Sequence, residues 1–242
     1  MINGLNFLST LFNQKVNSAN AGGRCVTCLS NHASHGLCPD CREDLPVNRW
    51  YCHACALPLP FAIPGLRCGE CLALPPPFSR SVIPWRYQFP VDGMIARYKY
   101  HGQRKFLRPL LADFSQYIDQ AVTPENRPEV IIPVPMHWRR RWARGFNQSA
   151  DIAESVGAAL GIPVATGLAR RTRRVQAQRG LNRAGRLANL QGVFEVCGTV
   201  PERVAIVDDV VTTGATVRVL ARCLVEAGAR DVQVWALART PG

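Results

Sequence analysis

The sequence predicts an α/β protein in which a parallel sheet flanked by helices is preceded by a small cysteine-rich module. After residue 78, short apolar runs alternate with segments whose apolar residues recur at helical spacing, which is typical of a parallel sheet covered on both faces. Eight of the ten cysteines lie between residues 25 and 71. A proline run at residues 74–78 follows them, and such a run acts as a stiff spacer. These observations place two structural units in the 242 residues.

We therefore divide the chain into three parts. Residues 1–20 form an N-terminal segment, for which an amphipathic helix is one interpretation. Residues 21–74 form the cysteine-rich module, and residues 78–242 form the α/β domain.

The cysteines of the module form four Cys-x-x-Cys pairs. A two-residue spacer lets both thiolates face one ion, and two such pairs complete a tetrahedral zinc site. A disulfide framework is the rival interpretation, but it belongs to secreted chains, and the N-terminus lacks the basic region and cleavage site of a secretory signal. We expect one or two structural Zn²⁺ ions, bound by Cys25, Cys28, Cys38, Cys41, Cys52, Cys55, Cys68 and Cys71.

The simplest assignment gives each consecutive pair of Cys-x-x-Cys motifs its own zinc ion, although nested or crossed pairing fits the spacing as well. A module with many prolines and few apolar runs cannot build a sufficient core alone, so metal binding would supply much of its folding energy. A purely structural role and a role in binding nucleic acid or a partner are equally compatible with this pattern.

The domain after the proline run contains strands and helices in alternation. Apolar runs predict strands at 81–87, where Pro84 weakens the prediction, and at 130–135, 204–207 and 232–237. Helical periodicity predicts helices at 91–100, 105–121, 148–160 and 216–227.

Residues 204–216 (VAIVDDVVTTGAT) carry the strongest chemical signal. A buried strand delivers Asp208 and Asp209 at its carboxyl end, where open α/β sheets bind ligands. A loop rich in hydroxyl groups then opens a helix, whose first N–H groups form a cradle for phosphate. Two carboxylates beside a phosphate need another partner, such as ribose hydroxyls or a bridging Mg²⁺. An acidic turn before an ordinary helix cap is the alternative, but such caps seldom follow paired acids on an apolar strand.

This segment closely resembles the 5-phosphoribosyl-1-pyrophosphate (PRPP) signature of type I phosphoribosyltransferases. With the Cys-x-x-Cys motifs before it, and with YKYHG (98–102), PVP (133–135) and RGFNQ (144–148) between, the chain resembles the ComF/GntX family from about residue 25 onward. The resemblance implies a type I phosphoribosyltransferase domain behind a double zinc ribbon. It also implies a link to DNA uptake, natural transformation or use of DNA as a nutrient.

The resemblance further implies roles for individual residues. Asp208 and Asp209 would be the catalytic residues and would hold the ribose hydroxyls, while Mg²⁺ would bridge these hydroxyls and the pyrophosphate. The reaction would transfer the phosphoribosyl group to an unidentified acceptor, of which a nucleobase is one candidate. The PRPP-binding set would be Asp208, Asp209, Val210, Thr212, Thr213, Gly214, Ala215 and Thr216.

The loop after the first core strand would approach the pyrophosphate. Within it Pro135, Arg139 and Arg144 are candidates, and Arg144 is preferred. Lys99 is either a phosphate ligand or a solvated helix lysine. Arg186 belongs to a segment at the position where a mobile lid covers PRPP in this family.

The net charge of +12 comes mostly from residues 137–190, where eleven arginines face two acidic residues. A polyphosphate substrate, a nucleic acid such as single-stranded DNA and a solvated basic face are the three interpretations, in that order. The DNA-uptake machinery is a further candidate partner. No apolar run approaches the roughly 20 residues of a transmembrane segment, so we expect a soluble cytoplasmic protein.

Overall fold

A computed structural model describes residues 21–61, 63, 65–138, 142, 144–172 and 192–241. The predicted N-terminal segment 1–20 lies outside the described residues. So do many arginines of the basic stretch, namely Arg139, Arg140, Arg141, Arg173, Arg174, Arg179, Arg183 and Arg186.

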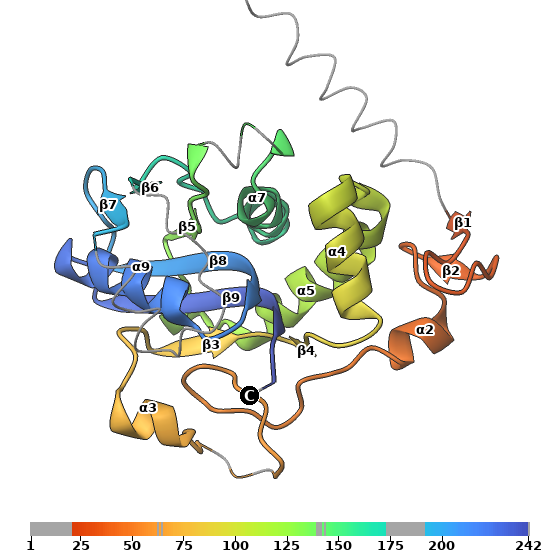
Figure 1. The fold of residues 1–242 in the computed structure, drawn as a ribbon, viewed down its shortest axis with the longest axis horizontal. Helices are drawn as coiled ribbons and strands as arrows, with labels where there is room; N and C mark the ends of the chain where they lie inside the picture. The colour runs from red at the N-terminus through yellow and green to blue at the C-terminus, as the bar shows by residue number, and fades with distance from the viewer. Residues whose placement is uncertain are drawn as a thin grey trace, which may run out of the picture.

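A parallel sheet lies at the centre of the molecule, as the apolar runs predict (Figure 1). Its order is β3–β9–β8–β5, with β4 also paired to β9, and every one of these pairs is parallel. Pro84 divides the first predicted strand into two short ones. The strands are β3 (Arg80–Val82), β4 (Trp85–Arg86), β5 (Val130–Pro133), β8 (Arg203–Val211) and β9 (Asp231–Arg239).

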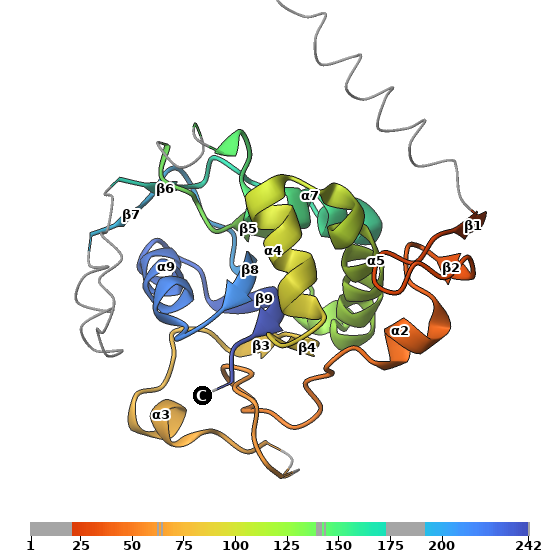
Figure 2. The ribbon, with the colours of Figure 1, turned by 45° about the vertical axis from the view of Figure 1, so that its right-hand side comes forward.

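Helices cover both faces of the sheet, as Figure 2 shows. One face packs against α4 (Val91–His101), α5 (Arg104–Ala121) and α7 (Gln148–Leu160). The other packs against α9 (Ala215–Glu226). Strands and helices thus alternate along the chain, which agrees with the predicted fold class.

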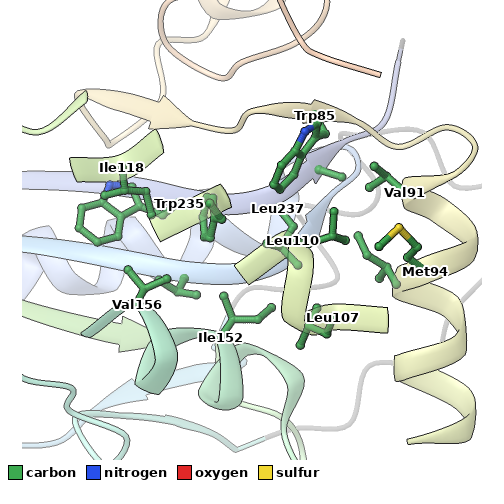
Figure 3. Packing of buried hydrophobic residues seen from close by; sticks show 14 of the residues in the cluster. Trp85, Val91, Met94, Leu107, Leu110, Ile118, Ile152, Val156, Trp235 and Leu237 are labelled. Atoms are coloured by element: carbon green, nitrogen blue, oxygen red, sulfur yellow. The ribbon is translucent and has the colours of Figure 1, made fainter. Parts of the chain in front are cut away.

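Alternate residues of β8 and β9 divide the core into two halves. Ala205, Val207, Trp235 and Leu237 point to the side of α4, α5 and α7, where Trp235 and Leu237 pack among the side chains of Figure 3. Val204, Ile206, Val234 and Ala236 point to the side of α9. Both strands are buried on two faces, and this explains why six of the nine residues in each are apolar.

The cysteine-rich module spreads over both faces of the sheet. Its first half contains β1 (Ala21–Gly23), β2 (Ala33–Ser34) and α2 (Pro39–Glu43), and its buried residues join the core of α4 and α5. Its second half contains α3 (Gly69–Ala73) and joins the core of α9. The two halves therefore stabilise different sides of the α/β domain.

Two features of the α/β domain were not predicted from the apolar pattern. An antiparallel pair joins β6 (Ala169–Arg171) to β7 (Phe194–Val196), and a short 3-10 helix, η1, spans Pro124–Asn126. Within the described part of the chain, no helix has the length and apolar character needed to cross a membrane.

Candidate functional site

The paired acids lie on β8 at the point where its neighbour β5 has ended. Pairing between β5 and β8 stops at Pro133 and Val207, while β8 stays paired with β9 as far as Val211. Val207 is thus the last residue of β8 that pairs with strands on both sides. Asp208 and Asp209 come directly after it. They lie inside β8, which is longer than the predicted 204–207, because pairing with β9 alone continues the strand.

Asp209 forms an ion pair with a lysine from α4. Lys99 Nζ lies 2.7 Å from Asp209 Oδ2, and Asp209 is 7% exposed. Burial disfavours the charged lysine, but the attraction of Asp209 outweighs it and raises the pKa of Lys99. Lys99 is thus held beside Asp208 and Asp209 by this ion pair, and its role towards phosphate stays a prediction.

Asp208 has a different environment. Its Oδ1 accepts hydrogen bonds from Ser149 Oγ at 3.0 Å and from the backbone N–H of Asp209 at 2.9 Å. Burial, followed by repulsion from Asp209, raises the pKa of Asp208 to about 7. Ser149, in the first turn of α7, is a site residue that the sequence analysis missed. Its only signal was a position next to the RGFNQ motif at a helix start.

The loop at residues 212–216 connects β8 to α9. Gly214 has φ +72° and precedes the first residue of α9, a left-handed conformation that glycine adopts at no steric cost. A small hollow at this helix start is lined by Asp208, Val210, Val211, Thr212, Gly214, Ala215, Thr216 and Val217. Six of the eight predicted PRPP-binding residues therefore line one hollow.

The remaining two predicted residues lie beside it. Asp209 faces Lys99. Thr213 Oγ1 accepts a hydrogen bond of 3.4 Å from the N–H of Ala215, the first residue of α9.

The structure describes two of the residues that were predicted to approach the pyrophosphate through the loop or the lid, Pro135 and Arg144. Pro135 follows Val134, whose N–H donates to the carbonyl of Val207 at 2.8 Å, so this loop begins beside the acids. Arg144 Nη1 donates to Gln148 Oε1 at 3.4 Å, and its guanidinium lies over the ring of Tyr100. Its role towards pyrophosphate stays a prediction. Arg139 and Arg186 lie outside the described residues.

The eight cysteines of the module form two groups of four. One consists of Cys25, Cys28, Cys38 and Cys41, here called the first cluster, and the other of Cys52, Cys55, Cys68 and Cys71, the second cluster. Within each cluster all sulfur atoms lie within 4.8 Å of one another. Consecutive motifs thus share a cluster, as in the simplest of the assignments.

The sulfur geometry fits zinc. A tetrahedral ion with Zn–S bonds of about 2.3 Å requires S···S separations of about 3.8 Å. Cys28 Sγ lies 3.6 Å from Cys38 Sγ, and Cys55 Sγ lies 3.7 Å from Cys68 Sγ. The backbone N–H of Cys68 donates to Cys52 Sγ at 3.2 Å, an interaction that favours a thiolate. None of the ten cysteines forms a disulfide in the structure.

Comparison with known proteins agrees with this arrangement. The double zinc ribbon domain family matches residues 22–72. Competence protein F of Haemophilus influenzae is 34% identical over 228 residues, covering 89% of this chain and 96% of that protein. The chain belongs to the ComF family. DNA utilization protein YhgH of Salmonella typhimurium, another ComF relative, is 35% identical over 221 residues, covering 85% of this chain and 97% of that protein.

Among solved structures, purine phosphoribosyltransferase from Pyrococcus horikoshii Ot3 is similar to this ComF-family chain. The matched region covers 55% of this chain and 82% of the phosphoribosyltransferase chain. The TM-score is 0.34 and the identity is 18%. Membership of the ComF family and two clusters of four cysteines support zinc as the metal of the module.

Proposed function

We propose that the protein binds PRPP with Mg²⁺ in the hollow at the end of β8. The reaction transfers the phosphoribosyl group to an acceptor, for which a nucleobase is a candidate. The cellular role of this reaction is in DNA uptake or DNA use. The names of its relatives, a competence protein and DNA utilization proteins, motivate the cellular role.

One observation carries the proposal. Asp208 lines the same hollow as Thr212, Gly214 and Thr216, at the start of a helix. A carboxylate would repel a phosphate bound alone, but it accepts hydrogen bonds from sugar hydroxyls. A ligand with a phosphate at one end and vicinal hydroxyls beside it satisfies both halves of the hollow.

Each group has a distinct task in this proposal. The N–H groups at the start of α9 and the hydroxyls of Thr212 and Thr216 bind the 5-phosphate, and Asp208 and Asp209 orient the ribose. Mg²⁺, when bound, neutralises the leaving pyrophosphate. The two acids stabilise the positive charge that develops on the anomeric carbon. Lys99 holds Asp209 in place before the ligand arrives.

Turnover is tested by incubating the zinc-loaded protein with labelled PRPP, Mg²⁺ and a panel of nucleobases while pyrophosphate release is followed. We expect base-dependent release that the Asp208→Asn/Asp209→Asn double variant loses. If PRPP raises the melting temperature without any release, the protein binds PRPP as a ligand only. If PRPP neither binds nor stabilises the protein, the proposed function is wrong.

A groove beside α4 supports a second candidate function, binding of single-stranded nucleic acid. It measures about 630 Å³, lies between the first cluster and the starts of α4 and α5, and none of its described lining residues is acidic. Its walls include Arg24, Arg97 and Lys105, together with Phe89, which is 79% exposed. Cations beside an exposed aromatic ring are the combination that binds a single strand.

A salt series tests this second function. We expect filter binding of single-stranded DNA to weaken with salt, and the Arg97→Ala/Lys105→Ala variant to reduce the slope by about 1.4, since each lost phosphate contact contributes about 0.7. Arg203→Ala/Arg230→Ala is the matched control, because it removes the same charge from exposed ion pairs with Glu129 and Glu202. Equal slopes for the two variants would assign any binding to net charge and not to the groove.

A further inference from the structure

Two buried arginines flank the loop at residues 212–216 and reach the second cluster. Arg218 lies in the first turn of α9, and Arg239 ends β9. They are 4% and 3% exposed. A buried guanidinium requires partners for its charge and its donors, so the contacts of these two residues identify what they do.

Arg239 joins the loop to the cysteine-rich module. Its Nη1 donates to the carbonyls of Val211, at 3.2 Å, and of Thr212, the residues that lead into the loop. Its Nε donates to the carbonyl of Cys55 at 3.1 Å. One rigid side chain thus fixes the entrance of the loop against a cysteine of the second cluster.

Arg218 makes the corresponding link at the other end of the loop. Its Nη2 lies 3.3 Å from Cys71 Sγ, and its Nη1 donates to the carbonyl of Leu74 at 3.0 Å. Its backbone N–H donates to the carbonyl of Gly214 at 3.0 Å. Arg218 therefore contacts a sulfur atom of the second cluster and also closes the first turn of α9, directly after the loop.

A filled second cluster would give these two arginines a counter-charge. Four thiolates outnumber the charge of one Zn²⁺, so a filled second cluster is formally negative, and all four of its cysteines are buried. The two arginines supply the compensating charge. Without the metal nothing would hold the four sulfur atoms together, so the contacts of Arg218 with Cys71 and of Arg239 with Cys55 would lose their fixed partners.

The first cluster has no comparable link to the loop among the described contacts. Its nearby arginine, Arg42, pairs with Asp113 of α5 at 3.0 Å and donates to the carbonyl of Ser34. These partners lie on the side of α4 and α5, away from α9. The two clusters are therefore unequal with respect to the site.

We propose that Arg218 and Arg239 are positioning residues through which the filled second cluster sets the geometry of the 212–216 loop, while the first cluster leaves this loop unaffected. The proposal deepens the proposed function and rests on it only where PRPP affinity is concerned. It assigns the second zinc ion a role in phosphate recognition in addition to a role in folding.

Hydrogen exchange on the full zinc-loaded chain tests the proposal without any ligand. We expect Arg218→Met to keep both zinc ions and to speed exchange of the amides at residues 212–216 by about tenfold, because it removes hydrogen bonds to a charged group. Arg42→Met is the matched control and should change this exchange by less than about twofold. Arg218→Lys keeps the charge without the planar fork and should restore part of the protection.

The PRPP titration separates the two ideas. If Arg218→Met speeds loop exchange and weakens PRPP binding by about tenfold with zinc retained, both ideas are supported. If exchange speeds up but the wild-type protein does not bind PRPP, the proposed function fails and the link between cluster and loop stands. If zinc-loaded Arg218→Met and Arg42→Met show the same loop exchange, the link is wrong, whether or not PRPP binds. Arg239→Met repeats the comparison at the other end of the loop, with the same overturning result.

Discussion

Two adjacent aspartates of one strand have different partners. Asp209 is buried and neutralised by Lys99 at 2.7 Å. Asp208 accepts hydrogen bonds from Ser149 and from the backbone, and burial with the neighbouring Asp209 raises its pKa to about 7. Near neutral pH, therefore, Asp208 can gain or lose a proton when a ligand binds.

This difference predicts a pH dependence of stability. Because the folded pKa of Asp208 is raised above its ordinary value of 3.8, its contribution is present at low pH and is lost as the pH rises through about 7. Asp208→Asn cannot ionise, so it should gain stability relative to the wild type as the pH rises from about 4 to about 7, by on the order of 1 kcal/mol per pH unit, and gain little more above pH 7. Urea unfolding of the ligand-free, zinc-loaded proteins measures this, and a difference that does not change with pH would contradict it.

At the scale of the element, the turn from β8 to α9 forms the proposed phosphate cradle. Its conformation depends on Gly214, whose φ of +72° lies in the left-handed region. An alanine there costs about 1–2 kcal/mol, since the left-handed conformation crowds Cβ against the backbone.

Gly214→Ala should therefore destabilise the protein and also weaken PRPP binding by about tenfold or more, because the loop shifts away from the anion. Gly161→Ala is the matched control. Gly161 has φ +65° at the end of α7, and a Cβ there meets no neighbour within 4 Å. Calorimetric titration should show equal losses of stability but a loss of affinity only for Gly214→Ala. Equal affinities would place the phosphate elsewhere.

The elements themselves were largely predictable from local pattern. Apolar runs and helical periodicity predicted all the central strands and the four large helices, and Pro84 marked the break between β3 and β4. The contacts between them were not predictable, because Lys99 and Asp209 are 110 residues apart and Ser149 and Asp208 are 59 apart. Arg239 at the end of an apolar strand was a signal for a buried charge, but its partner Cys55 lies 184 residues away.

For the whole molecule, the two clusters stabilise opposite faces of one sheet. The first joins the core of α4 and α5, and the second joins the core of α9. Their accessibility also differs, since Cys28 is exposed whereas the second cluster is buried throughout.

Stepwise chelation should therefore remove the two zinc ions in order. A chromogenic chelator should take the first ion from the exposed cluster rapidly and the second slowly, and the loss of the second should accompany global unfolding, because structural zinc supplies folding energy. Parallel absorbance and circular dichroism measurements follow both events. Release of both ions in one step would show that the clusters are not independent.

The central claim is that the hollow between Asp208 and the start of α9 binds PRPP. Isothermal titration of PRPP with Mg²⁺ into the zinc-loaded wild-type protein, and into Asp208→Asn/Asp209→Asn with matched zinc content and circular dichroism, tests it most directly. We predict saturable binding at one site per chain and a loss of at least about tenfold in the double variant, since hydrogen bonds to charged groups are removed. No saturable binding to the folded wild type, or equal affinity in the double variant, would contradict the claim.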